Sequence, residues 1–497
     1  MDQARRDRSA QHHHCMNTRI LFDSRRVRSL IAGLVLLLLP LAVATPAGAT
    51  GAHGDDRIWA STIATDGSVA LVGDFIGTAS FGGKTMRSLG AYDGFISVFN
   101  ADGSHRWSRR VGTPGTDYLW RAEFDGLGSV YVAGVMRGQL TIGPVRYGDP
   151  LRCSNTDNCQ DISTIVKFSR DGDVLWRWQR TGDWNEIRDI VVDRQNHLWV
   201  ADAWLYRIGE PAFGSRFMRF SPDGAIVAGN GTQSRYSDGL LVYDLTIDSR
   251  GDIVASGHFN CLPKLADAGL RVNTATKGAV LTPSADAQAL ALCYKSANSP
   301  RNAFLIKFSP EGMLRWSRAI GSEFNPEDAC CEWLGQVRSL PDGTLLASIG
   351  ELKRTLAFHS GRRSARPTAI VVSPAGDILG EFRNGTESGL AMTDRWLVTL
   401  TTRYGSRADQ LTLTQITGPS LMGGTRREID APGIIQFETT PNGRFVAVFA
   451  MWRPSELPIG EIGIEGISTL TRSSGARHLV LVGSLVDTLA LTWKKGF

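Results

Sequence analysis

The chain contains a series of short stretches in which nearly every residue is apolar, each placed directly after a turn with Gly or Asn. Such stretches, about four to eight residues long, are typical of strands that are buried on both faces. A weaker seventh stretch lies at residues 395–400, so we expect seven strands of this kind. The six clear ones are SVALVG after Gly67, SVYVAG after Gly128, HLWVAD after Asn196, DIVASG after Gly251, TLLASI after Gly343 and RFVAVF after Gly443.

A second pattern alternates with the first and marks further hairpins. A Phe precedes a turn Gly by four residues in FNADG, FSRDG, FSPDG and FSPEG, which end at Gly103, Gly172, Gly224 and Gly312, and VSPAG ends at Gly376. In three copies a Trp follows the Gly by four residues, at Trp107, Trp176 and Trp316. A strand that enters, a turn with a Gly suited to positive φ and a strand that leaves together predict an antiparallel hairpin.

Two hairpins per repeat predict a four-stranded unit of about 63 residues, repeated seven times over residues 58–497. Such small sheets cannot bury both faces alone, and radial stacking of neighbouring sheets solves this problem. We therefore expect an all-β fold, a seven-bladed β-propeller of four-stranded antiparallel blades. An open solenoid, or six or eight blades, are the alternatives, because residues 390–433 fit the repeat poorly.

The repeats resemble the bacterial SBBP-type β-propeller repeats of exported proteins. The resemblance lies in YDGFISVFNADGSHRWSRRVGTPGTDY, ISTIVKFSRDGDVLWRWQRTGDW and NAFLIKFSPEGMLRWSRAIG, and it covers residues 58–345 better than the last 150. The resemblance implies a propeller outside the cytoplasm. It implies no catalytic residue, because the family has none in common.

The first 49 residues predict a secretory signal peptide. Arginines precede LIAGLVLLLLPLAVA at residues 30–44, which is too short for a stable membrane span, and small-residue cleavage sites end at Ala44 and Ala49. Met16 is a second candidate for the start, and residues 50–57 read as a short linker. Without residues 1–49 the chain keeps 47 basic and 46 acidic residues, so we expect an extracytoplasmic location and no nucleic-acid binding.

Long insertions and cysteines fall on the connections of one predicted face. The insertions span about residues 138–161 and 260–302, with a further long connection at 322–333. All six cysteines after the signal lie there, and an even number in an exported chain predicts disulfides. We expect Cys153 to pair with Cys159, whereas the sequence leaves two pairings open for the other four. They are Cys261, Cys293, Cys330 and Cys331.

The sequence lacks the spacings that mark catalytic or metal sites. No GxSxG, GxGxxG, CxxC or HExxH is present, and we expect no metal, no cofactor and no catalytic residue. The phrase DGDVLW resembles the Gly-x-x-x-Trp phrases of quinoprotein dehydrogenases, but the chain lacks their regular Trp pattern and their eight blades. Catalysis is therefore the less favoured interpretation.

Aromatic residues near the predicted connections are the candidate binding residues. Rings beside acidic residues can stack on a sugar or hold a peptide, although the same pairs could simply anchor each loop. We expect a monomeric, exported binding module for a protein, peptide or glycan. The alternatives are a propeller enzyme (lyase, hydrolase or quinone-dependent dehydrogenase) with a site at the axial opening, and an envelope structural module. The candidates are Tyr118, Trp120, Trp184, Tyr236 and Trp333.

Overall fold

The described part of the chain consists of β-strands. Among these residues there is no helix, and hence none with the length and apolar character needed to cross a bilayer. In the computed structural model the described residues are 56–147, 162–180, 185–205, 213–229, 240–259, 302–320, 333–351, 369–382, 387–392, 396–402, 409–415, 426–430, 434–440, 443–450, 478–485 and 489–496.

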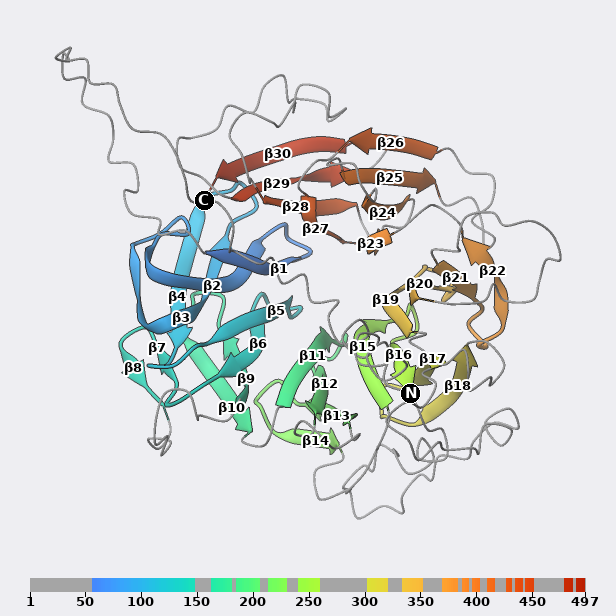
Figure 1. Ribbon diagram of the computed structural model, residues 1–497, viewed down its shortest axis with the longest axis horizontal. Helices are drawn as coiled ribbons and strands as arrows, with labels where there is room; N and C mark the ends of the chain where they lie inside the picture. The colour runs from blue at the N-terminus through green and yellow to red at the C-terminus, as the bar shows by residue number, and fades with distance from the viewer. Residues whose placement is uncertain are drawn as a thin grey trace, which may run out of the picture. The chain divides into compact units, whose positions relative to one another are not determined.

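The strands of each of the first four sheets follow one another along the chain, except that the last two strands of sheet 1 lie in sequence between the second and third strands of sheet 2 (Figure 1). Sheet 1 contains β1 (Arg57–Ile63), β2 (Val69–Ala79), β3 (Met86–Phe99), β4 (His105–Gly112), β7 (Thr141–Ile142) and β8 (Val145–Arg146). Sheet 2 contains β5 (Tyr118–Phe124), β6 (Val130–Met136), β9 (Ile162–Phe168) and β10 (Val174–Arg180). Sheet 3 contains β11 (Asn185–Val192), β12 (Leu198–Leu205), β13 (Phe213–Phe220) and β14 (Ile226–Gly229). Sheet 4 contains β15 (Leu240–Ile247), β16 (Ile253–Phe259), β17 (Asn302–Phe308) and β18 (Leu314–Ile320).

The remaining three sheets follow the same order. Sheet 5 contains β19 (Trp333–Ser339), β20 (Leu345–Glu351), β21 (Ala369–Val372) and β22 (Ile378–Phe382). Sheet 6 contains β23 (Glu387–Met392), β24 (Trp396–Thr402), β25 (Asp409–Gln415) and β26 (Arg426–Asp430). Sheet 7 contains β27 (Ile434–Thr439), β28 (Arg444–Ala450), β29 (His478–Leu485) and β30 (Leu489–Gly496). In the described residues all pairings are antiparallel, so the predicted all-β fold of four-stranded antiparallel sheets is confirmed.

The second strand of each sheet carries the core. All seven residues of β6 are buried, and Val69 to Phe75 of β2 are buried as well. Since side chains alternate between the two faces of a strand, such a strand needs apolar partners on both faces of its sheet. The predicted all-apolar stretches, including the weak one at β24, occupy this second position.

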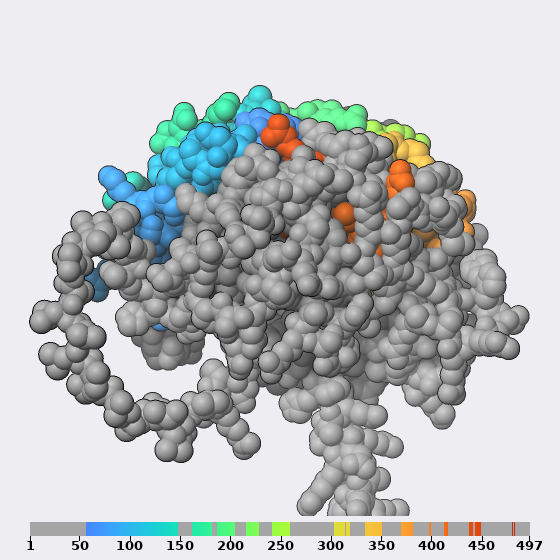
Figure 2. Space-filling model, turned by 90° about the horizontal axis from the view of Figure 1, so that it is seen from above, coloured from blue at the N-terminus to red at the C-terminus, as the bar shows by residue number. Residues whose placement is uncertain are grey.

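Apolar clusters supply these partners by joining one sheet to the next. Separate clusters combine residues of sheets 1 and 2, 2 and 3, 3 and 4, 4 and 5, and 5 and 6. A further cluster combines Leu71 and Phe75 of sheet 1 with Val446 and Val448 of sheet 7. The first strands contact one another in the same order, and β27 of sheet 7 contacts β1 of sheet 1. Figure 2 shows the described residues that reach one face of the molecule in the same blue-to-red colouring.

The Trp of the last strand ties its sheet to the next one. The indole N–H of Trp107 donates to the carbonyl of Arg170 at 2.8 Å, and Trp176 donates to Pro222 at 2.9 Å. Trp316 donates in the same way to Pro374 at 3.0 Å. Each ring lies against the turn Gly of the next sheet, where φ is positive and an added Cβ would meet the ring within 3 Å. The repeated Phe, Gly and Trp pattern therefore encodes contacts between sheets as well as turns.

The insertion after β6 differs from the prediction of a loop on one face. Part of it forms β7 and β8, and β7 pairs with β4 through Val111 opposite Ile142 and Gly112 opposite Thr141. Sheet 1 consequently has six strands instead of four. Pairing satisfies backbone groups at an otherwise open sheet edge, which gives this part of the insertion a structural role.

The Trp contact predicts a measurable loss of stability. Trp176→Ala removes a ring that packs against Tyr131 and Phe220 of two sheets and leaves a cavity, so we expect the free energy of unfolding to fall by about 3 kcal/mol. Urea unfolding measures this change. Leu127→Ala is the control, because Leu127 is 70% exposed and its loss should change stability by less than about 0.5 kcal/mol. Equal effects of the two substitutions would contradict the contact.

Candidate functional site

Aromatic rings gather where the first strands of sheets 1 and 2 begin. Trp59 lies on β1, Tyr92 on β3, and Tyr118 and Trp120 on β5. The centroids of Tyr92 and Tyr118 are 6.4 Å apart with planes 27° from parallel, and those of Tyr118 and Trp120 are 6.3 Å apart at 21°. We call these four rings, together with Arg57, the aromatic group.

Arg57 joins three of the rings. Its guanidinium carbon lies 4.8 Å from the ring centroid of Tyr92, 5.1 Å from that of Trp59 and 5.9 Å from that of Tyr118. The buried Asp74 accepts from Arg57 Nε at 3.0 Å and also from the indole N–H of Trp59. Burial raises the pKa of Asp74 to about 6, although Arg57 and Trp59 act to lower it. Arg57 and Trp59 remain partly exposed, so the aromatic group presents a surface to solvent.

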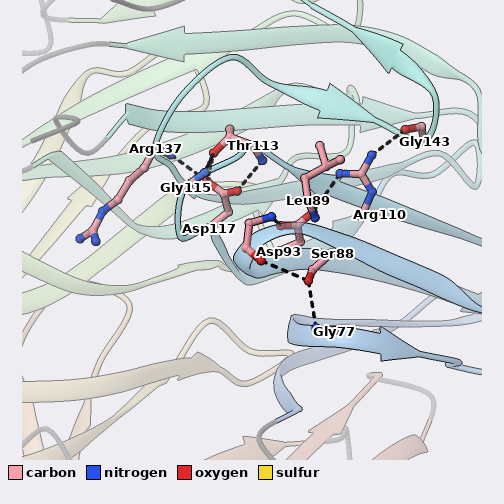
Figure 3. A network of polar contacts seen from close by, with 11 residues as sticks. Gly77, Ser88, Leu89, Asp93, Arg110, Thr113, Gly115, Asp117, Arg137 and Gly143 are labelled. Atoms are coloured by element: carbon pink, nitrogen blue, oxygen red, sulfur yellow. Dashed lines mark hydrogen bonds and ion pairs between the residues drawn. The ribbon is translucent and has the colours of Figure 1, made fainter. Parts of the chain in front are cut away.

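Two buried carboxylates fix the backbone beside these rings (Figure 3). Asp93 follows Tyr92 and accepts from Arg110 Nη1 at 2.8 Å and from the N–H of Leu89 at 3.0 Å. Asp117 precedes Tyr118 and accepts from Thr113 Oγ1 at 2.9 Å and from the N–H of Arg137 at 2.7 Å. Burial raises the pKa of Asp117 to about 7. Asp117 therefore anchors a loop, which is the alternative that the sequence left open for the acidic neighbours.

A β-bulge recurs in the first strand of each sheet and helps to aim these side chains. The register of β1 shifts at Trp59, that of β5 at Trp120, that of β11 at Arg188 and that of β15 at Tyr243. Corresponding shifts occur in β19, β23 and β27. A bulge bends the strand and redirects its side chains. In sheets 1, 2 and 4 the residue at the bulge is a large aromatic one.

Charged side chains lie further along the same first strands. Arg121 Nε lies 3.0 Å from Asp189 Oδ1, which joins sheets 2 and 3. Arg338 Nη1 of sheet 5 lies 2.9 Å from Asp244 Oδ2 of sheet 4, and Arg338 Nη2 lies 3.9 Å from Glu438 Oε2 of sheet 7. These five residues and Glu123 of β5 are the charged group.

Backbone N–H groups and one hydroxyl donate hydrogen bonds to the carboxyl groups of the charged group. Asp189 Oδ2 accepts from the N–H of Leu245 at 2.7 Å, and Asp244 Oδ2 accepts from the N–H of Val337 at 2.8 Å. Glu123 Oε2 accepts from Thr62 Oγ1 of sheet 1 at 3.4 Å. Both aspartates thus hold the first strand of the following sheet, whereas among the described residues Glu123 accepts one long hydrogen bond.

Burial and nearby negative charges raise the pKa of Glu123, Asp189 and Glu438 in the charged group. Burial, followed by the charges of Glu438 and Asp189, raises the pKa of Glu123 to about 8. Burial and the charge of Asp244 raise the pKa of Asp189 to about 7. Burial acts to lower the pKa of Arg338, but its carboxylate neighbours raise it overall, so Arg338 stays charged. At neutral pH the carboxyl of Glu123 therefore carries its proton.

Three of the five predicted binding residues lie in the described part of the chain. Tyr118 and Trp120 belong to the aromatic group, and the indole N–H of Trp120 donates to the carbonyl of Ile187 in sheet 3 at 2.7 Å. Trp333 begins β19 and lies 5.1 Å from Tyr243, ring centroid to ring centroid. All three are strand residues, although the sequence placed them at connections. Trp184, Tyr236 and the six predicted disulfide residues, Cys153, Cys159, Cys261, Cys293, Cys330 and Cys331, lie outside the described residues.

Comparison with known proteins gives structural neighbours only. The chain matches no protein-family model and no curated protein sequence. A solved protein from Lactobacillus plantarum is similar at 11% identity and a TM-score of 0.40, over 76% of this chain and 85% of that one. The β-propeller domain of the trilobed protease from Pyrococcus furiosus is similar at 10% identity and a TM-score of 0.37, over 80% and 88%.

An enzyme is also among the neighbours. The quinohemoprotein alcohol dehydrogenase from Comamonas testosteroni is similar at 13% identity and a TM-score of 0.34. The match covers 73% of this chain but only 57% of that enzyme. Within the described residues, no three His, Cys, Asp or Glu side chains are grouped so that they could hold a metal ion.

The raised pKa values predict a pH-dependent stability. The pKa of Glu123 is raised from its ordinary value of 4.5 to about 8. Between these two pH values the folded chain holds a proton on Glu123 that the unfolded chain releases. The free energy of unfolding should therefore fall as pH rises through this window, and Glu123→Gln should flatten the fall. Urea unfolding from pH 4.5 to 8.5 measures both profiles, with Glu311→Gln at an exposed turn as control. A native profile that rises over this range would contradict the protonated state.

Proposed function

We propose that the chain is a closed seven-bladed β-propeller. The support is the cluster that joins sheet 7 to sheet 1, together with the contact of β27 with β1. Arg444 of sheet 7 also donates to the carbonyl of Asp66 in sheet 1 at 3.0 Å. The ion pair between Arg338 and Glu438 adds support from the other side, since sheets 5 and 7 are not neighbours and can meet only if their first strands surround a common centre.

The proposed role of this propeller is to bind a glycan through the aromatic group. The single observation that carries the proposal is the row of Tyr92, Tyr118 and Trp120, partly exposed, with Arg57 among the rings. Aromatic rings bury the apolar faces of sugars, and a guanidinium donates to sugar hydroxyls. A glycan is favoured over a peptide, because a row of rings offers repeated flat contacts and no deep apolar pocket for a side chain.

The sequence adds a location and a covalent framework to the proposal. The signal peptide at residues 1–49 supports export, and the resemblance to SBBP-type repeats of exported proteins agrees with it. The even number of cysteines after the signal supports disulfides, with Cys153 and Cys159 as one pair. Such disulfides would restrain the long connections that carry the cysteines.

A glycan-binding measurement tests this function. Screening the purified chain against an array of oligosaccharides and peptides should give glycan ligands, and Tyr118→Ala should weaken their binding about tenfold. Leu127→Ala, on a turn at the other end of β5, should leave binding unchanged. Ligands that are all peptides, or glycan binding that Tyr118→Ala does not weaken, would contradict the proposal.

A second candidate function is acid catalysis on a glycan, and Glu123 is the observation that favours it. Its raised pKa keeps the carboxyl protonated near neutral pH, which is the state that a general acid needs. Glu438 supplies a neighbouring carboxylate from sheet 7. Incubating the bound glycan with the chain separates the two functions: cleavage that Glu123→Gln abolishes supports catalysis, and recovery of intact glycan supports binding alone.

A further inference from the structure

A recess of about 550 Å³ lies at the junction of sheets 4 and 5, beside the tight turns. Its apolar wall consists of Pro310, Pro374 and the ring of Trp316, and its rim carries the side chains of Arg250 and Arg315. The ammonium of Lys307, which is 1% exposed, also lines it. No residue of the aromatic group or the charged group takes part, so this recess is separate from the candidate site above.

The corresponding junction between sheets 2 and 3 shows why a recess exists here. There Lys167 Nζ donates to the carbonyl of Pro222 in the next sheet at 3.1 Å, and Trp176 donates to the same carbonyl. Lys167 also pairs with Asp125 at 3.0 Å. The lysine side chain thus extends across that junction to the next sheet.

Lys307 occupies the position of Lys167 but pairs differently. Its ammonium contacts Asp248 and lies 3.4 Å from Asp252 Oδ2, so it is held within sheet 4. Pro374, the counterpart of Pro222, accepts from Trp316. An ammonium has three N–H donors. Among the described residues the ammonium of Lys307 has two carboxylate neighbours, Asp248 and Asp252, so it has donor capacity for a ligand in the recess that it lines.

Asp252 gives Lys307 an acidic neighbour that Lys167 lacks at the equivalent position. It ends the turn between β15 and β16, at the position that Ser68, Ser129 and Thr344 occupy in the turns of sheets 1, 2 and 5. A hydroxyl is neutral and shorter, whereas the carboxylate of Asp252 attracts Lys307 away from the junction. The space has a second source, because Val254 lies opposite Lys307 where the larger Tyr131 lies opposite Lys167 and packs on Trp176.

The rim supplies further donors for an anion. Arg315 Nε lies 3.6 Å from Asp252 Oδ1, and Arg250 Nε lies 4.0 Å from Asp248 Oδ2. Both distances exceed those of hydrogen bonds, and both side chains are more than half exposed, so their guanidinium groups keep N–H donors for a ligand. We infer that this recess binds a small monocarboxylate whose apolar body lies against Trp316, Pro310 and Pro374.

The charge of the lining selects a monoanion over a phosphate. Asp252 and Glu311 also line the recess, and both would repel an entering dianion. A planar carboxylate carries one charge, matches the fork of a guanidinium and accepts from Lys307 at the same time. The apolar wall would contact the remaining, apolar surface of the ligand.

Ligand-observed NMR with benzoate as the probe tests this site on the full chain. Benzoate should bind saturably with a Kd of about 1 mM. Benzamide, which has the same shape without the charge, and inorganic phosphate should both bind at least about tenfold more weakly. Equal binding of benzoate and benzamide, tighter binding of phosphate, or no saturable benzoate binding would overturn the inference.

Two variants locate the bound probe. Arg315→Gln should weaken benzoate about tenfold, and Asp252→Ser should do the same by restoring the residue found in the turn of sheet 2, which lets Lys307 reach Pro374. Arg170→Gln is the control, because Arg170 is an equally exposed turn arginine of sheet 2. Thermal melting checks that each variant folds. If Asp252→Ser does not fold, Arg315→Gln decides, and an effect no larger than that of Arg170→Gln would overturn the inference.

Discussion

The constraint on which the structure depends is the burial of the second strand of each sheet on both faces. An isolated four-stranded sheet would leave both faces of β6 open to solvent, yet every residue of β6 is buried. Each sheet therefore needs a neighbour on either side, and this requirement includes the first and the last sheet. The cluster that joins Leu71 and Phe75 to Val446 and Val448 meets it between sheets 1 and 7.

The packing of the sheets then determines which polar side chains of different sheets lie close together. Because the first strands contact one another in order, residues at equivalent positions of different sheets come together even when hundreds of residues separate them. Glu438 of sheet 7 acts on Glu123 of sheet 2 in this way, since its charge helps burial to raise the pKa of Glu123. Three rings of the aromatic group also lie near the beginnings of first strands, and the bulges at Trp59 and Trp120 redirect two of them, whereas Tyr92 lies on β3.

The strands were predicted well, because each hairpin is marked by residues only a few positions apart in the chain. A turn Gly four residues after a Phe and four before a Trp predicts a hairpin, and the hairpins that contain Trp107, Trp176 and Trp316 are present. Tyr118 and Trp120 could be singled out as aromatic residues near a connection. Their ring contacts with Tyr92 could not, since Tyr92 belongs to another sheet and no spacing links it to β5.

The charged group escaped prediction for the same reason. Arg338 and Glu438 are 100 residues apart, and a single charged residue in a strand is ordinarily read as solvent-exposed. Arg121, Asp189 and Asp244 each directly follow a bulge, but a bulge is a matter of strand register and leaves no mark in one sequence. The hairpin of β7 and β8 was missed because two-residue strands carry no periodicity.

Cross-linking between the first and the last sheet tests the closed ring most directly. Thr65→Cys and Arg444→Cys place thiols in the turns of sheets 1 and 7, where Arg444 reaches the carbonyl of Asp66. A short bifunctional maleimide should join these two positions, as identified by mass spectrometry of the peptides. The pair Thr65→Cys and Asp342→Cys, in the turns of sheets 1 and 5, should give no such product. A cross-link absent from the first pair, or equally abundant in both, would contradict closure.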